Sequence, residues 1–147
     1  MKKLLLISLV IFFTICSKSW AEDRKDKGLI CEGIDNPRHP QVWFFENEFE
    51  INNIEFDNTK KKGIYKYATR YYFVDVKSIK WSMVVDADSR FILDRKTLKL
   101  ELQQWNEAQS KIEYFYYQCR ITNWAGIEEF YKPQMDKLKE DLKKNKI

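Results

Sequence analysis

Acidic side chains gather between residues 46 and 57 and are the first candidates for chemistry. The set is Glu46, Glu48, Glu50, Glu55 and Asp57. Two such carboxylates can act as the acid and base of a glycoside hydrolase when they flank the scissile bond. Acidic residues on the wet face of a strand are far commoner than catalytic pairs, and nothing in the sequence fixes their separation. We therefore predict no catalytic residue and keep a carboxylate-dependent hydrolase as the weaker alternative.

The only histidine of the chain, His39, lies between Pro37 and Pro40. Each proline lacks a backbone N–H donor and favours an extended backbone conformation for the residue before it, so we predict that this segment is a surface loop. One loop histidine cannot supply the base of a Ser-His-Asp set, and no ligand cluster accompanies it. The sequence therefore predicts neither a nucleophilic triad nor a structural zinc site.

A second metal motif also fails. Residues 86–90, Asp-Ala-Asp-Ser-Arg, open like a calcium loop, but Arg90, Phe91 and Thr97 stand where an oxygen ligand, a Gly and a Glu are needed. With only four glycines there is also no phosphate-cradling loop. We predict no metal site and no cofactor, and we interpret residues 86–90 as a turn.

Aromatic residues are the remaining candidates for binding. Alternating tyrosines can line a groove that stacks a sugar or another flat ligand. They also favour strands and fill small β cores, which is the commoner outcome. The candidate ligand-facing residues are Tyr65, Tyr67, Tyr71, Tyr114 and Tyr116.

Residues 79–102 give the clearest prediction of the strands that position these side chains. Alternation predicts a strand with Ile79, Trp81, Met83 and Val85 on one face, and two further strands at 91–93 and 98–102. Pairing Val85 with Phe91 and Met83 with Leu93, then Leu93 with Leu98 and Phe91 with Leu100, places the large apolar side chains of both hairpins' pairs on one side. Asp94 and Arg95 are predicted to be turn residues between the second and third strands. The result is a three-stranded meander with one dry face.

The same stretch carries a family resemblance. Residues 91–98, Phe-Ile-Leu-Asp-Arg-Lys-Thr-Leu, preceded by Ile79-Lys80-Trp81, resemble small secreted bacterial proteins of unknown function. Their pattern is an I-x-W strand followed by a strand ending in I-D-R-x-T-G, with Leu93 here at the Ile and Leu98 at the Gly. The resemblance implies a secreted β-rich domain with a cysteine near each end, and it implies no activity.

Residues 1–21 are predicted to be a cleaved signal peptide. Lys2 and Lys3 precede an apolar segment from Leu4 to Ile15, and Ser19-Trp20-Ala21 offers a small-x-small cleavage site. Because residues 1–21 contain three lysines and no acid, cleavage lowers the formal net charge from +4 to +1. We expect secretion to the bacterial periplasm, no nucleic-acid partner and no stable membrane span after cleavage.

Cysteine usage predicts one disulfide. Cys16 leaves with the signal peptide, so Cys31 and Cys119 alone enter an oxidising compartment. Each lies in a strand-like segment, near opposite ends of the β-rich region. A bond between them would tie the first strand of the mature domain to the last.

Residues 22–147 are predicted to form a single, mainly β domain: an antiparallel meander of about six to eight strands, either an open sheet or a small barrel. Phe49 and Ile51 are expected to face inward, Asn52-Asn53 to mark a bulge or turn, and the strand at 111–121 to be covered on both faces. A helix over 123–147 follows, broken or restarted at Pro133.

The predicted function is binding without catalysis, of an unknown protein or small-molecule partner. Two alternatives stay open, a periplasmic enzyme inhibitor and a small-molecule-binding barrel. Small-barrel lysozyme inhibitors are also secreted β domains with a bridge, but their Ser-Gly-x-x-Tyr loop is missing here.

Overall fold

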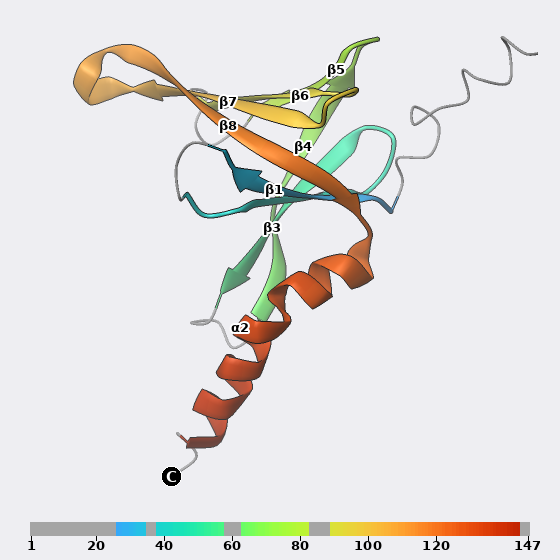
Figure 1. Cartoon of the computed structure of the whole chain (residues 1–147), viewed down its shortest axis with the longest axis vertical. Helices are drawn as coiled ribbons and strands as arrows, with labels where there is room; N and C mark the ends of the chain where they lie inside the picture. The colour runs from blue at the N-terminus through green and yellow to red at the C-terminus, as the bar shows by residue number, and fades with distance from the viewer. Residues whose placement is uncertain (1–25, 35–37, 58–62, 83–88, 145–147) are drawn as a thin grey trace, which may run out of the picture.

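The computed structural model describes residues 26–34, 38–57, 63–82 and 89–144, with Ala68 and Thr69 described in their backbone alone. The predicted signal peptide lies outside these residues. In chain order the elements are β1 (Gly28–Gly33), β2 (Gln41–Phe45), β3 (Glu50–Asp57), β4 (Gly63–Val74), β5 (Ser78–Ser82), β6 (Ser89–Asp94), β7 (Lys99–Asn106), a 3₁₀ turn (Glu107–Gln109), β8 (Lys111–Thr122) and α2 (Trp124–Lys144) (Figure 1).

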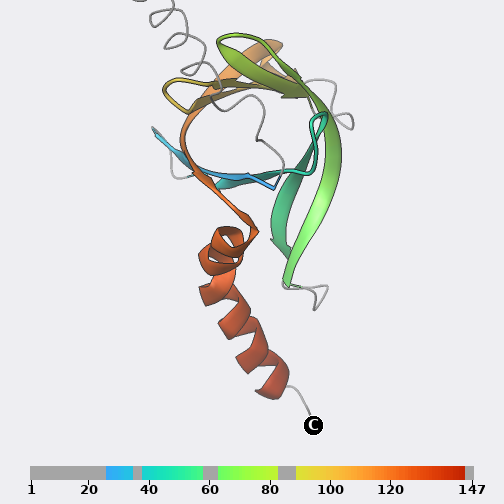
Figure 2. The ribbon, with the colours of Figure 1, turned by 90° about the vertical axis from the view of Figure 1, so that its right-hand side faces the viewer.

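The strands form a closed antiparallel barrel in sequence order, and β1 pairs with β8 to complete it. Figure 2 shows the strands as a ring with α2 extending away from one side. The predicted meander with a C-terminal helix is confirmed, and of the two predicted forms the chain adopts the barrel. Eight strands give an interior just wide enough for side chains to fill.

The apolar face of the central meander is core, as predicted. Trp81, Phe91, Leu93 and Leu100 are buried, while Met83 and Val85 lie outside the described residues. The predicted register is wrong, because Phe91 pairs with Trp81 and Leu102, and Leu93 pairs with Ile79 and Leu100. Each true register differs from the predicted one by an even number of residues. Since side chains alternate with a period of two, an even shift leaves the faces unchanged.

Aromatic rings dominate the barrel interior. Trp43 lies edge-on against Trp81 and Phe91, with ring centroids 5.1 and 4.8 Å apart. The rest of this core is formed by inward residues from strands around the barrel: Leu29, Phe45, Ile51, Tyr72, Ile79, Leu93, Leu100, Leu102, Tyr117 and the two cysteines. The side chains of the described strands therefore occupy the interior.

A second apolar layer lies outside the barrel, between α2 and the outer face of β1 to β4. Ile30, Val42, Phe44 and Ile54 from the strands pack against Ile127 and Tyr131 from the helix. The helix begins at a cap in which Asn123 accepts a hydrogen bond from the N–H of Gly126 at 2.9 Å. A Cβ on Gly126 would lie 1.9 Å from the hydroxyl of Thr122, so a larger residue at this position would require the Thr122 side chain to move.

Three local predictions are corrected. Phe49 is exposed, because β3 begins only at Glu50 and Phe49 belongs to a turn in which its N–H donates to Asn47 at 2.8 Å. The helix continues through Pro133 as one element and bends along its length (Figure 1), since a missing N–H removes a single hydrogen bond. The outer face of β8 is exposed at Tyr114 and Tyr116, because α2 packs on β1 to β4 instead.

The sequence predicted either a bulge or a turn at Asn52-Asn53, and the structure has a bulge next to Asn53. Asn53 pairs with Ala68 and Ile54 with Lys66, which leaves Tyr67 as the extra residue of β4. The bulge lies next to the point where β2 stops pairing with β3.

Candidate functional site

Cys31 and Cys119 are bonded and lie directly opposite one another in the β1–β8 ladder, with Cα atoms 3.9 Å apart. Both are buried. The predicted bond therefore joins the two strands whose pairing closes the barrel. Its buried position makes it a structural link rather than a reactive group.

Asp94 organises the turn between β6 and β7. Its carboxylate accepts hydrogen bonds from the N–H of Lys96 at 3.0 Å and from the N–H and hydroxyl of Thr97 at 2.7 and 2.8 Å. The bonds from Thr97 hold the pKa of Asp94 below its ordinary value. Leu98 has a φ of 56°, a left-handed conformation that glycine adopts without strain.

Arg95 lies against the neighbouring turn, between β4 and β5. Its guanidinium donates to the carbonyls of Asp75 and Val76 at 2.9 and 3.3 Å. Asp75 pairs with Lys80 and accepts hydrogen bonds from the backbone and hydroxyl of Ser78, which together lower the pKa of its carboxyl. This β4–β5 turn is thus fixed from both sides, and it presents Val76 at 89% exposure.

The five candidate tyrosines do not converge on one site. Tyr65 and Tyr67 contact each other edge-on at 6.1 Å, on the part of the β3–β4 hairpin that extends past β2. Tyr71 lies farther along β4 and is 70% exposed. Tyr114 and Tyr116 lie on the outer face of β8. None of the five belongs to the barrel's buried core.

Tyr71 belongs to a cluster that we call the aromatic surface: Phe49, Tyr71, Phe73 and Val74. The three rings are 67, 70 and 75% exposed. Together with Glu48 and Tyr72 they line an open depression of about 530 Å³. The N–H of Tyr72 donates to the carbonyl of Phe49 at 3.0 Å, which holds the turn against the strand.

A second group of exposed apolar side chains, which we call the hairpin surface, lies on the outer face of β7 and β8. It consists of Trp105, Ile112, Tyr114 and Tyr116. Trp105 pairs with Ile112, and Tyr114 and Tyr116 follow at alternate positions of β8. Among the described residues, the pairing of β6 with β7 extends to Gln104, opposite Ser89, and residues 105–112 lie beyond it.

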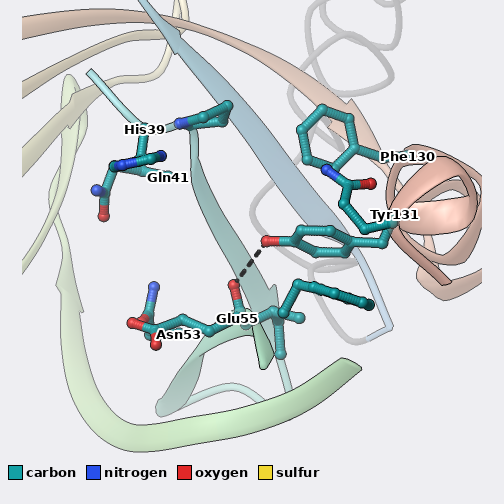
Figure 3. Close-up of a pocket in the computed structure, with 10 residues that line it drawn as sticks. His39, Gln41, Asn53, Glu55, Phe130 and Tyr131 are labelled. Carbon is teal, nitrogen blue, oxygen red and sulfur yellow. Dashed lines mark hydrogen bonds between the residues drawn. The ribbon is translucent and has the colours of Figure 1, made fainter. Parts of the chain in front are cut away.

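A groove of about 430 Å³ lies between α2 and the separated ends of β2 and β3. The two strands pair at residues 51–53 of β3. Beyond Asn53, two backbone carbonyls accept hydrogen bonds from side chains instead. Asn53 donates to the carbonyl of Val42 at 3.3 Å, and the hydroxyl of Tyr131 donates to the carbonyl of Ile54 at 3.1 Å. Figure 3 shows His39, Gln41, Asn53 and Glu55 across the groove from Phe130 and Tyr131.

Tyr131 is the electrostatically perturbed residue of the groove. Burial raises its pKa to about 12, and the negative charge of Glu55 adds to the shift. The phenol therefore stays protonated well above neutral pH and remains a hydrogen-bond donor.

Three of the acidic residues of 46–57 are held in separate polar contacts. Glu46 pairs with Lys66 and accepts from Asn52, Glu50 accepts from Asn47 at 2.6 Å, and Glu55 accepts from Tyr65 at 3.3 Å. Across the described ranges no group of three or more His, Cys, Asp or Glu side chains is arranged to hold a metal ion. In the same part of the chain, no helix has the length and apolar character to cross a membrane.

Comparison with protein-family models, with curated proteins and with solved structures found no significant match. The arguments for function therefore come from the molecule itself.

Sequence reasoning missed Phe49, Phe73 and Val76 as surface residues and Phe130 as a groove residue. Alternation around Tyr72 could have identified Phe73, because Tyr72 faces the barrel core and its two neighbours must face out. The groove left no such signal, because it depends on where β2 and β3 separate.

Proposed function

We propose that the protein is a secreted, non-enzymatic binding protein that holds a protein partner through the aromatic surface. The observation that carries the proposal is the cluster of Phe49, Tyr71 and Phe73, each more than 60% exposed on one face of the molecule. The predicted leader and the Cys31–Cys119 bond support secretion, and we propose the bacterial periplasm as its location.

The exposed area is large for a monomer. Aromatic side chains bury 150–250 Å² each, so three rings exposed to about 70% leave roughly 300 to 500 Å² of apolar surface in water. An apolar patch of that size is comparable with the largest patch on a typical monomer, which is often a functional contact site. Aromatic anchors also dominate the binding energy of protein interfaces.

The surface is also preorganised. The backbone bond between Tyr72 and Phe49 holds the turn before β3 against β4, and Arg95 and Asp75 fix the β4–β5 turn that follows Val74. A rigid surface loses little conformational entropy when a partner binds, which favours affinity.

A protein fits this surface better than the other ligands considered. The barrel interior is filled by the core side chains, which argues against a small molecule within the barrel. Glu48 lines the depression, and its charge does not suit an anionic membrane. An enzyme inhibitor is one form that a protein-binding role could take, with the target enzyme as the partner.

The test compares two double variants. Tyr71→Ser with Phe73→Ser removes two rings from the aromatic surface, and Tyr114→Ser with Tyr116→Ser removes two from the hairpin surface as the matched control. The wild type and the control should retain the same partner in affinity capture from the cells that produce the protein. With that partner purified, the Tyr71 and Phe73 variant should bind at least about tenfold more weakly by calorimetry, with an unchanged melting temperature. Equal affinity of both variants would refute the proposal.

A further inference from the structure

We infer that the groove between α2 and the separated ends of β2 and β3 binds a neutral, hydroxyl-rich ligand of the saccharide class. This site is separate from the aromatic surface, and the inference does not depend on the proposed function. The groove's volume of about 430 Å³ lies within the usual range of small-ligand sites.

The groove presents side chains rather than a strand edge. Where β2 and β3 separate, Asn53 already donates to the carbonyl of Val42, and Tyr131 already donates to that of Ile54. Backbone groups along a strand point alternately to each side, so among the described residues of β3 past Ile54, Phe56 alone can offer its backbone to the groove. One residue is too short an edge for an extended peptide to add as a strand. A ligand recognised by side chains is therefore favoured.

The chemistry of the polar wall suits hydroxyl groups. Gln41, Asn53 and Gln134 carry amides, which both donate and accept hydrogen bonds, as a hydroxyl does. His39 and Glu55 add a ring nitrogen and a carboxylate acceptor. Among the described residues, no Lys or Arg lines the groove, so an anionic ligand would find no cation to pair with.

The opposite wall is aromatic. Phe130 and Tyr131 contact each other edge-on at 5.0 Å, and Tyr131 is fixed by its bond to Ile54 and by stacking on Phe56 at 5.9 Å. Phe130 is only partly buried, and it faces the polar residues across the groove (Figure 3). A flat apolar ring opposite hydrogen-bonding amides matches a sugar, which has C–H groups on one face and hydroxyls around its edge.

The test uses nuclear magnetic resonance of the purified protein with three neutral trisaccharides: cellotriose, maltotriose and triacetylchitotriose. At least one should give saturable shift changes at Gln41, Glu55 and Gln134. Phe130→Leu, which keeps an apolar side chain, and Gln134→Ala, at an exposed position, should each weaken that binding about tenfold. Tyr114→Leu on the hairpin surface is the matched control and should bind as the wild type does.

Two comparison probes define the outcomes that overturn the inference. Trigalacturonate tests an anionic sugar, and an uncharged hexapeptide of alternating valine and threonine tests an added strand. The assignment is wrong if no neutral trisaccharide gives shift changes at the groove. It is also wrong if trigalacturonate or the hexapeptide alone gives them. The variant with Tyr71 and Phe73 replaced by Ser should still bind the trisaccharide, so failure of the protein-binding proposal and failure of this one remain distinguishable.

Discussion

Removing the Cys31–Cys119 bond should destabilise the protein by a large fraction of its total stability. The bond lies inside the β1–β8 ladder, and among the described strands that ladder alone joins two that are distant in sequence. The other pairings join consecutive strands, so they form across short loops. Without the bond, the unfolded chain must bring together two strands separated by 88 residues.

The magnitude follows from loop closure. For a separation of 88 residues the chain-entropy model gives about 4 to 5 kcal/mol at 25 °C. Small domains are stable by about 5–15 kcal/mol in total, so this one link is a large part of that sum. For a domain of this size the loss corresponds to a fall in melting temperature of about 10 to 25 °C.

The assay is thermal unfolding of the wild type, Cys31→Ser, Cys119→Ser and the double variant. All three variants should melt at nearly the same temperature, because each removes the same covalent link. Thiol titration of the denatured, non-reduced wild type should find none free among Cys31 and Cys119. A double variant that melts within about 3 °C of the wild type, which is less than 1 kcal/mol, would refute the closure argument.

The remaining predictions concern single side chains. Leu93→Ala should cost about 2 to 5 kcal/mol in urea unfolding, because Leu93 is fully buried; a near-neutral result would contradict the core assignment. Asp94→Ala should destabilise the protein less than Leu93→Ala does. That penalty should be present above pH 3.8, the ordinary pKa, and should disappear as the pH falls through the lowered pKa of the folded state; a penalty independent of pH would refute it. Tyr131→Phe should cost about 1 kcal/mol at neutral pH through its lost hydrogen bond. Because the folded pKa of Tyr131 is raised to about 12, the wild type should lose stability relative to this variant as pH rises from 10 to 12, and parallel curves would exclude the shift.

For the central meander, the sequence predicted which face of the sheet each side chain occupies better than it predicted which residues pair across the strands. Alternation placed Trp81, Phe91 and Leu93 correctly in the core, although Phe91 pairs with Trp81 rather than Val85. A face depends only on the parity of a residue within its strand. The register of a strand pair depends on the length of the turn between the strands. A turn of different length can shift the pairing by two or four residues without changing the face on which any side chain lies.

Closure of the barrel could be anticipated from the cysteines, although alternation alone fits an open sheet equally well. The cysteines predicted that the first and last strands are neighbours, and the β1–β8 ladder satisfies that. The groove could not be predicted, because it exists only where β2 leaves β3 and where Tyr131, 77 residues from Ile54, fills the gap. Such a site depends on the meeting of three elements, and no local pattern records it.

The same sequence signature has two different outcomes in this fold. β2 and β8 both carry large apolar residues at consecutive positions, so each has two apolar faces and one of them must lie outside the barrel. Outside β2, Phe44 is covered by Trp124 of α2 at 5.3 Å and becomes a second core. Outside β8, and likewise outside β4 at Tyr71 and Phe73, no described element covers the rings. The helix packs against only one side of a closed barrel, so apolar residues on the outer face elsewhere stay in water. Tyr71 and Phe73 on β4 are 70 and 75% exposed, against 52 and 44% for Tyr114 and Tyr116 on β8, so the more exposed rings on β4 are those that we propose a binding partner covers.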